Sequence, residues 1–125
     1  MQTNSIETHH STTLQYVHWF RHSAPYINAH RNKTFVIMFD GEAVQHDNFQ
    51  HIIHDIALLH SLGIRLILVH GARPQINHNL KQSQIQTPFH QHRRVTTRES
   101  LSCVMNAVGS IRLQIEALLS MVMAD

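Results

Sequence analysis

Two short turns in this chain combine a glycine with charged or polar side chains directly after a strand-like run. The first turn, Asp40-Gly41, follows the apolar run 34–39, and the second turn, residues 70–74, follows the run 64–69. In an α/β sheet the carboxyl ends of parallel strands open onto crevices, and the N-termini of the following helices favour anions. The two turns therefore have the placement of a phosphate-binding site.

The side chains in these turns do not suit phosphoryl transfer. Met38 carries no charge, and the carboxylate of Asp40 would repel a phosphate. Arg73 stands where a glycine would let the backbone approach a ligand. Phosphoryl transfer depends on positioning and on positive charge at the phosphate, so we expect no kinase activity. We expect instead that the turns keep the backbone arrangement of a phosphate-binding site but serve another function. Arg73 could then form an ion pair with Asp40.

The elements that position the turns are predicted by hydrophobic periodicity. Residues 34–39 and 64–69 are nearly unbroken apolar runs, as in buried parallel strands. Between them, residues 48–62 carry an apolar stripe at helical spacing, with Asp47 as a possible cap and Gly63 at the end. This order predicts a right-handed βαβ unit with two adjacent parallel strands.

The second half of the chain predicts two further helices. Pro74 suits the first turn of a helix that runs to about Lys81. Residues 82–94 are polar and are expected to form a loop or a hairpin. Thr96 and Glu99 have the spacing of a capping box for a long final helix with an apolar face.

The N-terminal segment has a different character. Residues 1–13 are polar and aperiodic, so we expect a disordered tail there. Apolar residues at helical spacing follow, and Pro25 is expected to interrupt that helix. These apolar residues are Leu14, Val17, Trp19 and Phe20. Because a short helix is marginal on its own, we expect this one to mediate a homo-oligomer.

Length and composition limit the possible classes of protein. The chain has 125 residues, which allow one domain at most, and the α/β pattern is incomplete at this length. A net charge of +2, from 10 Lys and Arg against 8 Asp and Glu, is too small to indicate nucleic-acid binding. A single cysteine, Cys103, fits a reducing compartment. No apolar run is long enough for a signal or a membrane span, so we expect a cytoplasmic protein.

Histidine is unusually frequent, with 13 in the chain. Pairs such as His51 and His54, or His90 and His92, have spacings that could share a metal. The histidines are nevertheless scattered over all segments, and no HExxH or Cys-His grouping is present. We therefore expect no metal site.

Several stretches resemble a known family. The strings 20–31, 33–38, 58–66 and 71–76, together with Arg94-Val95-Thr96, look like those of bacterial N-acetylglutamate synthases. The resemblance runs from about residue 14 to the C-terminus. It implies an amino-acid-kinase-like fold, which is an α/β three-layer αβα sandwich with a mainly parallel sheet. Residues 14–125 would be the N-terminal portion of that domain, and hence an incomplete sandwich.

The resemblance also implies two domains with separate functions. The family joins an N-terminal kinase-like domain, which senses arginine and builds the oligomer, to a C-terminal domain that transfers acetyl from acetyl-CoA to L-glutamate. This chain resembles about the first half of the kinase-like domain, so no acetyl-CoA site and no other cofactor is expected in it. L-arginine is the implied allosteric ligand of the full-length protein.

The resemblance assigns roles to a few residues of this chain. His22 and Tyr26 match positions beside the arginine site, although helix packing explains them equally well. Arg94 aligns with the arginine that holds the substrate carboxylate in the related kinases, and its neighbour Arg93 makes a solvated basic edge the alternative. No catalytic residue is assigned.

The turns depart from the pattern of acetylglutamate kinases. Those enzymes carry Lys-x-Gly-Gly at the first turn, where residues 38–41 of this chain read Met-Phe-Asp-Gly. At the second turn they carry His-Gly-Gly-Gly-Pro, where Gly71 is kept but Ala72 and Arg73 replace the next two glycines. The phosphate-contacting lysine is absent, and Asp40 departs even from the Gly-Gly usual in the synthases.

The sequence thus favours the regulatory and assembly portion of an N-acetylglutamate synthase, with no catalysis of its own. The alternative is a truncated, non-catalytic module of the same fold that binds a metabolite or another subunit. A divergent kinase is disfavoured by Met38 and Asp40. The reading frame beyond Asp125 would separate the first two possibilities.

Overall fold

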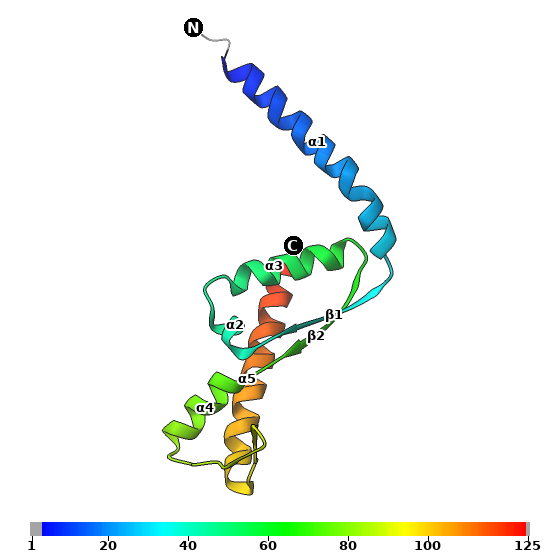
Figure 1. Ribbon diagram of the computed structural model, residues 1–125. Coiled ribbons are helices and arrows are strands. Elements are labelled where there is room, and N and C mark those ends of the chain that lie inside the picture. The colour runs from blue at the N-terminus through cyan, green and yellow to red at the C-terminus, as the bar shows by residue number, and fades with distance from the viewer. Residues whose placement is uncertain (1–3, 125) are drawn as a thin grey trace.

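The computed structural model of the protein describes residues 4–124, with side chains from residue 12 onward. One long helix extends away from a body in which strands and helices pack together (Figure 1). In chain order the elements are α1 (Asn4–His30), β1 (Thr34–Phe39), α2 (Gly41–Gln45), α3 (Phe49–Ser61), β2 (Arg65–His70), α4 (Arg73–Gln82), β3 (Phe89–His90), β4 (Arg93–Arg94) and α5 (Arg98–Met123).

The predicted pair of parallel strands is confirmed. β1 and β2 pair in parallel from Thr34 opposite Arg65 to Phe39 opposite His70, and α3 lies between them in the chain. β2 begins one residue later than the apolar run suggests. Gly63 has φ of 85°, a left-handed conformation that suits glycine, and it lets the chain turn from α3 into β2.

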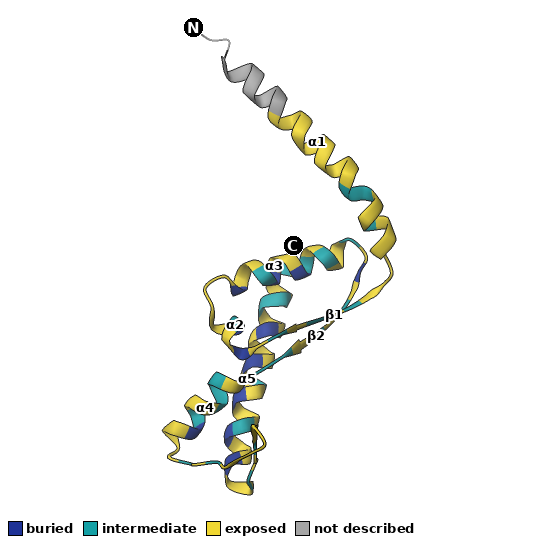
Figure 2. Cartoon of the chain, in the orientation of Figure 1, coloured by how far each residue is buried: buried dark blue, intermediate teal, exposed yellow. Residues whose placement is uncertain are grey.

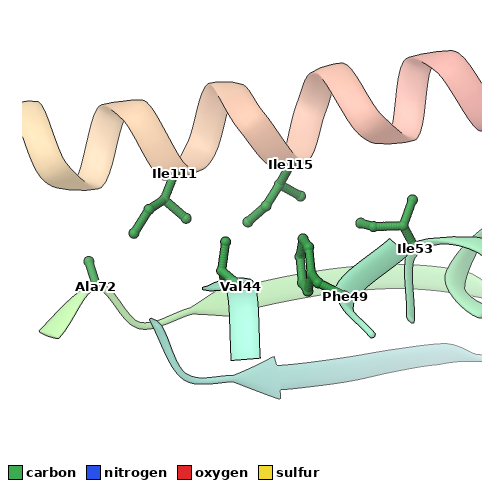
Figure 3. Close-up of a cluster of buried hydrophobic side chains, with 6 residues drawn as sticks. All are labelled: Val44, Phe49, Ile53, Ala72, Ile111 and Ile115. Atoms are coloured by element: carbon green, nitrogen blue, oxygen red, sulfur yellow. The ribbon is translucent and has the colours of Figure 1, made fainter. Parts of the chain in front are cut away.

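The hydrophobic core lies on one face of this sheet, where α2, α3 and α5 meet. In Figure 3 the two isoleucines of α5 point toward the side chains from the other elements. The buried cluster consists of Val44, Phe49, Ile53, Ala72, Ile111 and Ile115. Burial of this apolar area stabilises the fold by about 25 cal/mol per Å² removed from water.

The opposite face of the sheet is open. Alternate strand residues point away from the core, beginning with Thr34 and Arg65, and the others of this exposed set are apolar: Val36, Met38, Ile67 and Val69. Helices among residues 4–124 therefore cover the sheet on one side. The second helical layer of a three-layer sandwich is not supplied by the described residues.

The start of α1 differs from the prediction. The disordered tail was expected over residues 1–13, but helical structure begins at Asn4, so this prediction is wrong for residues 4–13. Residues 1–3 lie outside the described part of the chain. Once a helix is nucleated, each added residue gains one hydrogen bond, and polar residues such as those in 4–13 can extend it.

The predicted break at Pro25 is also wrong, because α1 continues through Pro25 to His30. Proline removes one N–H donor and strains the preceding turn, but it does not force the chain to leave the helix. Near this point Ser23 Oγ donates to the carbonyl of Trp19 at 2.9 Å, one turn earlier.

Two predicted helix caps are shifted by one residue. Asn48 rather than Asp47 occupies the N-cap of α3, and its side chain makes no capping hydrogen bond. At α5 the capping box is Thr97 with Ser100, not Thr96 with Glu99. The Ser100 hydroxyl accepts from Thr97 N at 2.9 Å, and Ser100 N donates to Thr97 Oγ1 at 3.2 Å. The fully buried Ser100 thus has its polar groups satisfied within the cap.

The base of α1 is fixed to the body at the turn between α3 and β2. Asn32 N donates to the carbonyl of Gly63 at 2.8 Å, and the side chain of Arg31 lies against Gly63. The ring of His30 meets that of Phe35 edge to face, with centroids 5.4 Å apart. Beyond this attachment, α1 is exposed along most of its described length (Figure 2).

Candidate functional site

The structure brings the two glycine turns into direct contact. Gly71 N donates to the carbonyl of Phe39 at 2.9 Å. A Cβ placed on Gly71 would lie 3.2 Å from Gly41 N and 3.3 Å from Asp40 Cα. The second turn therefore needs a glycine because the backbone of the first turn passes close to it.

A side chain of α4 lies against the first turn. Gln75, near the start of α4, donates its amide Nε2 to the carbonyl of Gly41 at 2.8 Å. Its Oε1 is buried without a hydrogen-bond partner and lies 2.4 Å from the place of a Cβ on Gly41. Ala72, which replaces a kinase glycine, is buried in the core. A side-chain amide from α4 is thus hydrogen-bonded to the backbone of the first turn.

The charged side chain of Asp40 has another partner than expected. Asp40 Oδ1 accepts from Ala43 N at 2.8 Å and caps α2, which places its negative charge favourably at a helix N-terminus. The predicted ion pair between Asp40 and Arg73 is absent from the described residues.

One ion pair is present in the described part of the chain, and it lies outside the turns. It joins Arg112 Nε to Glu116 Oε1 on α5, at 2.8 Å. The hydrogen bond and the charge of Glu116 raise the pKa of the Arg112 guanidinium above its usual value. Exposed pairs of this kind contribute little to stability.

Met38 does not face the turns. Its side chain is 79% exposed on the open face of the sheet, so the place of the kinase lysine holds an uncharged group that points to solvent. Together with the capping role of Asp40, this leaves the first turn without a cation to stabilise a transferring phosphate.

The contact between the turns predicts a cost for any side chain at Gly41. In Gly41→Ala the new Cβ would meet Gln75 Oε1 at 2.4 Å and Pro74 Cδ at 2.9 Å. We expect the free energy of unfolding to fall by about 1–3 kcal/mol, the usual cost of overpacking, as measured by urea denaturation.

The matched control for this substitution is Gly109→Ala in α5. Apart from its chain neighbours and the backbone of α5 itself, no heavy atom lies within 4 Å of a Cβ at Gly109. Since alanine is the better helix former, Gly109→Ala should raise stability by about 0.5–1 kcal/mol. Equal effects of the two substitutions would show that the contact between the turns does not matter.

Arg94 belongs to β4, which forms a hairpin with β3. The segment that carries this hairpin lies at the end of the body away from α1 (Figure 1). The Arg94 guanidinium donates to Thr87 Oγ1 and to Asn77 Oδ1, and it lies over the ring of Phe89, with 4.9 Å from Cζ to the centroid. These partners hold the side chain in place, and Arg94 is half-buried. Of the two predictions for residues 82–94, a loop or a hairpin, the structure shows a hairpin, and the side chain of Arg94 has partners within the protein.

A shallow cavity of about 340 Å³ adjoins this arginine between α4 and the hairpin. Arg73, His92 and Arg94 all line it, so the structure brings together two cations and an imidazole from segments far apart in the sequence. Sequence reasoning did not assign His92 to this site. Its position depends on the tight turn at Gln91 and His92, both of which have positive φ. A carboxylate is the kind of group that such a lining would bind.

His22 and Tyr26 lie one turn apart on the exposed part of α1, well away from Arg94. Tyr26 is 71% exposed, and His22 is also exposed. The ring of His22 meets that of His18 edge to face, with centroids 4.3 Å apart. The backbone carbonyl of Tyr26 lies 2.7 Å from Nδ1 of His30. Neither side chain is buried against the body of the described chain.

No group of three or more His, Cys, Asp and Glu side chains is arranged to hold a metal ion in the described part of the chain. No helix among the same residues is long and apolar enough to cross a membrane.

The fold and the turns agree with the comparison to known families. Residues 33–124 match the Amino acid kinase family, and this span includes both glycine turns and the hairpin. The chain belongs to the amino acid kinase family. The amino-acid-kinase-like fold inferred from the sequence is thereby confirmed, and so is the resemblance to N-acetylglutamate synthases described next.

Within this family the chain is similar to amino-acid acetyltransferases. It is 58% identical over 109 residues to that of Azotobacter vinelandii, with 87% of this chain and 25% of the relative aligned. It is 56% identical over 110 residues to that of Pseudomonas syringae pv. tomato, with 88% of this chain and 26% of the relative aligned. The chain thus spans about a quarter of the length of these relatives.

Solved structures give the same result. N-acetylglutamate synthase from Neisseria gonorrhoeae in complex with coenzyme A and N-acetyl-glutamate superposes with a TM-score of 0.72, at 34% identity, over 83% of this chain and 24% of that chain. The same enzyme in complex with coenzyme A and L-arginine gives a TM-score of 0.71, also at 34% identity and over the same shares.

Proposed function

We propose that this chain is the N-terminal regulatory and assembly portion of an N-acetylglutamate synthase. The observation that carries the proposal is the 56–58% identity to amino-acid acetyltransferases over 87–88% of the chain. The enzyme makes N-acetyl-L-glutamate from acetyl-CoA and L-glutamate. Both substrates would bind to sequence beyond these residues, because the chain spans about a quarter of its relatives.

The geometry of the turns supports a role without phosphoryl transfer. The Gln75 amide is hydrogen-bonded to the carbonyl of Gly41, the carboxylate of Asp40 caps α2, and Met38 faces solvent. Phosphoryl transfer depends on positioning the phosphate and on stabilising its charge, and these turns provide neither. The kinase-like fold would therefore serve as a frame that holds α1 and the remaining layers of the domain.

Arginine sensing is the regulatory role that we assign to this frame. A structure of the Neisseria gonorrhoeae relative contains L-arginine. In this chain the exposed His22 and Tyr26 lie one turn apart on α1, where a guanidinium could stack on the phenol ring and the imidazole could hydrogen-bond the ligand. The remaining donors for the α-carboxylate of arginine would come from sequence beyond residue 125.

Tyr26→Ala and His22→Ala in the full-length protein test this assignment. Tyr26→Ala removes the aromatic face and should weaken arginine binding about tenfold, as expected for a cation–π contact of moderate strength. His22→Ala removes the imidazole hydrogen bond and should weaken binding by about the same factor. Isothermal titration calorimetry measures the effect directly. Residues 1–125 alone should give no measurable heat with arginine, because they would hold only half of the site.

The matched control is Tyr16→Ala, which removes an equally exposed tyrosine of α1. Its arginine affinity should equal that of the unsubstituted protein. Unchanged affinity in both Tyr26→Ala and His22→Ala would remove these residues from the arginine site.

A stand-alone module that binds a carboxylate is the second candidate function. The cavity lined by Arg73, His92 and Arg94 favours it, because this lining concentrates positive charge without a carboxylate among its residues. We place such a module, like the synthase, in the cytoplasm. This location agrees with the single cysteine, Cys103, which is buried and forms no disulfide. The native reading frame beyond Asp125 separates the module from the synthase.

A further inference from the structure

The charges of this chain are unevenly distributed along it. Residues 56–98 contain six Lys and Arg residues and no Asp or Glu, although the whole chain is nearly balanced at 10 against 8. Five of the six lie in one part of the fold, which we call the basic lobe: residues 73–101, comprising α4, the β3–β4 hairpin and the first turn of α5. These five are Arg73, Lys81, Arg93, Arg94 and Arg98. Glu99 is the one carboxylate in the sequence of the lobe, so the lobe has a positive potential.

The basic lobe is held together by hydrogen bonds at the end of the body away from α1 (Figure 1). The two bonds donated by Arg94 tie the hairpin to α4. Val95 N donates to the carbonyl of Pro88 at 2.9 Å, and Asn79 Nδ2 donates to the carbonyl of Cys103 on α5 at 3.4 Å. A surface that is already ordered loses less entropy when a partner binds to it.

Two hollows in the lobe share Arg94 and Phe89 in their linings. The first is the cavity of about 340 Å³ that also contains Arg73 and His92, and the second measures about 440 Å³ and contains Lys81. Apolar side chains also line them, Ile76 and Val104 in the first and Leu80 and Ile85 in the second. Both hollows therefore combine cations with apolar surface.

This combination fits a peptide better than a small carboxylate. The five cations are spread over α4, β4 and α5, and all but the half-buried Arg94 are exposed. One small molecule could contact the cations of one hollow, whereas several carboxylates along a peptide could contact both. We propose that the basic lobe docks an acidic segment of a separate protein partner, in which Asp or Glu residues alternate with apolar side chains. This role goes beyond the two candidate functions above, which concern small ligands and assembly.

Nucleic acid fits the basic lobe less well. Proteins that bind single strands use aromatic side chains on which the bases stack. Phe89 is the one Phe, Tyr or Trp in residues 73–101, and the guanidinium of Arg94 lies over its ring. Residues 40–55 carry four carboxylates and no Lys or Arg, so a long polyanion would also meet repulsion on the body.

Fluorescence anisotropy with a labelled peptide tests the proposal on the whole chain of residues 1–125. The probe is a Glu-rich peptide of about ten residues that also contains Leu, and it spans about 33 Å when extended. The chain should bind it, and raising the salt from about 50 to about 200 mM should weaken binding about tenfold. Arg73→Glu/Lys81→Glu reverses one charge in each hollow and should weaken binding by about tenfold or more.

The matched control is Arg21→Glu/Lys33→Glu, which changes the net charge by the same amount at two exposed residues outside the lobe. It should keep the peptide affinity within about twofold. Circular dichroism should show the same helix content in both double variants, and Arg93→Glu/Arg98→Glu repeats the test on the hairpin and α5. An equal loss of affinity in the lobe variants and in the control would overturn the proposal, and so would no loss in either.

Two competing ligands separate the proposal from its alternatives. Glutarate is the small dicarboxylate, and a single-stranded RNA of the same charge is the polyphosphate. Glutarate that binds as tightly as the peptide would overturn docking and would leave the carboxylate cavity as the function of this lobe. RNA that binds more tightly than the peptide would also overturn docking. Peptide binding that persists while glutarate fails to bind would support docking and remove the small-ligand function.

Discussion

Removal of residues 1–25 is expected to abolish self-association of the full-length protein. α1 presents a broad set of exposed apolar side chains to solvent, and the body of the protein does not cover them. The members of this set among the described side chains are Leu14, Tyr16, Val17, Trp19, Phe20 and Tyr26. An exposed helix with this composition is marginal on its own and is typical of a contact surface.

The same surface can be tested without a deletion. Trp19→Asp and Phe20→Asp place charges on it while leaving the body unchanged, because neither side chain is buried. Large aromatic anchors commonly contribute about 2 kcal/mol or more to an interface, so each substitution should weaken association more than tenfold.

Size-exclusion chromatography with multi-angle scattering measures the mass of each variant. The matched control is Leu113→Asp, which charges an equally exposed apolar residue of α5. This control should keep the mass of the unsubstituted protein. An unchanged mass after deletion of residues 1–25 would rule out assembly through α1.

Ile53→Ala is expected to cause the largest loss of stability among single substitutions in the body. Ile53 is only 1% exposed and belongs to the cluster where α3 faces α5 (Figure 3). Truncation removes buried methyl groups and leaves a cavity that the two helices can close only in part. We expect the free energy of unfolding to fall by about 2–5 kcal/mol.

Urea denaturation followed by circular dichroism measures this loss. Leu113→Ala is the control, since Leu113 is 67% exposed on α5 and should cost little when truncated. A loss below that of the control would mean that α3 and α5 do not share a core.

The βαβ unit could be predicted from the sequence because its signals are local. Each strand is a short apolar run, and α3 has a stripe at helical spacing followed by Gly63, so order and approximate bounds follow. The predictions for α1 were wrong because its polar N-terminal composition indicated a disordered tail and Pro25 indicated the end of the helix. Neither feature forbids a helix that is already propagating.

The turns were harder to predict because their contacts join residues far apart in the chain. Asp40 was interpreted as a charge facing a ligand, whereas it caps α2, a helix of five residues that is too short to show periodicity. The hydrogen bond from Gln75 to Gly41 joins residues 34 positions apart, and no local sequence pattern predicts it. Arg94 was identified through the family resemblance, but its neighbour His92 reaches the cavity only through the geometry of the hairpin.

We propose that this chain is the non-catalytic first part of an N-acetylglutamate synthase. The most direct test is to express the native reading frame, including whatever follows Asp125, and to measure formation of N-acetyl-L-glutamate from acetyl-CoA and L-glutamate. We expect the longer protein to form this product and L-arginine to inhibit it, while residues 1–125 alone form none. A native frame that ends at Asp125, or a longer protein that forms no N-acetyl-L-glutamate, would contradict the account.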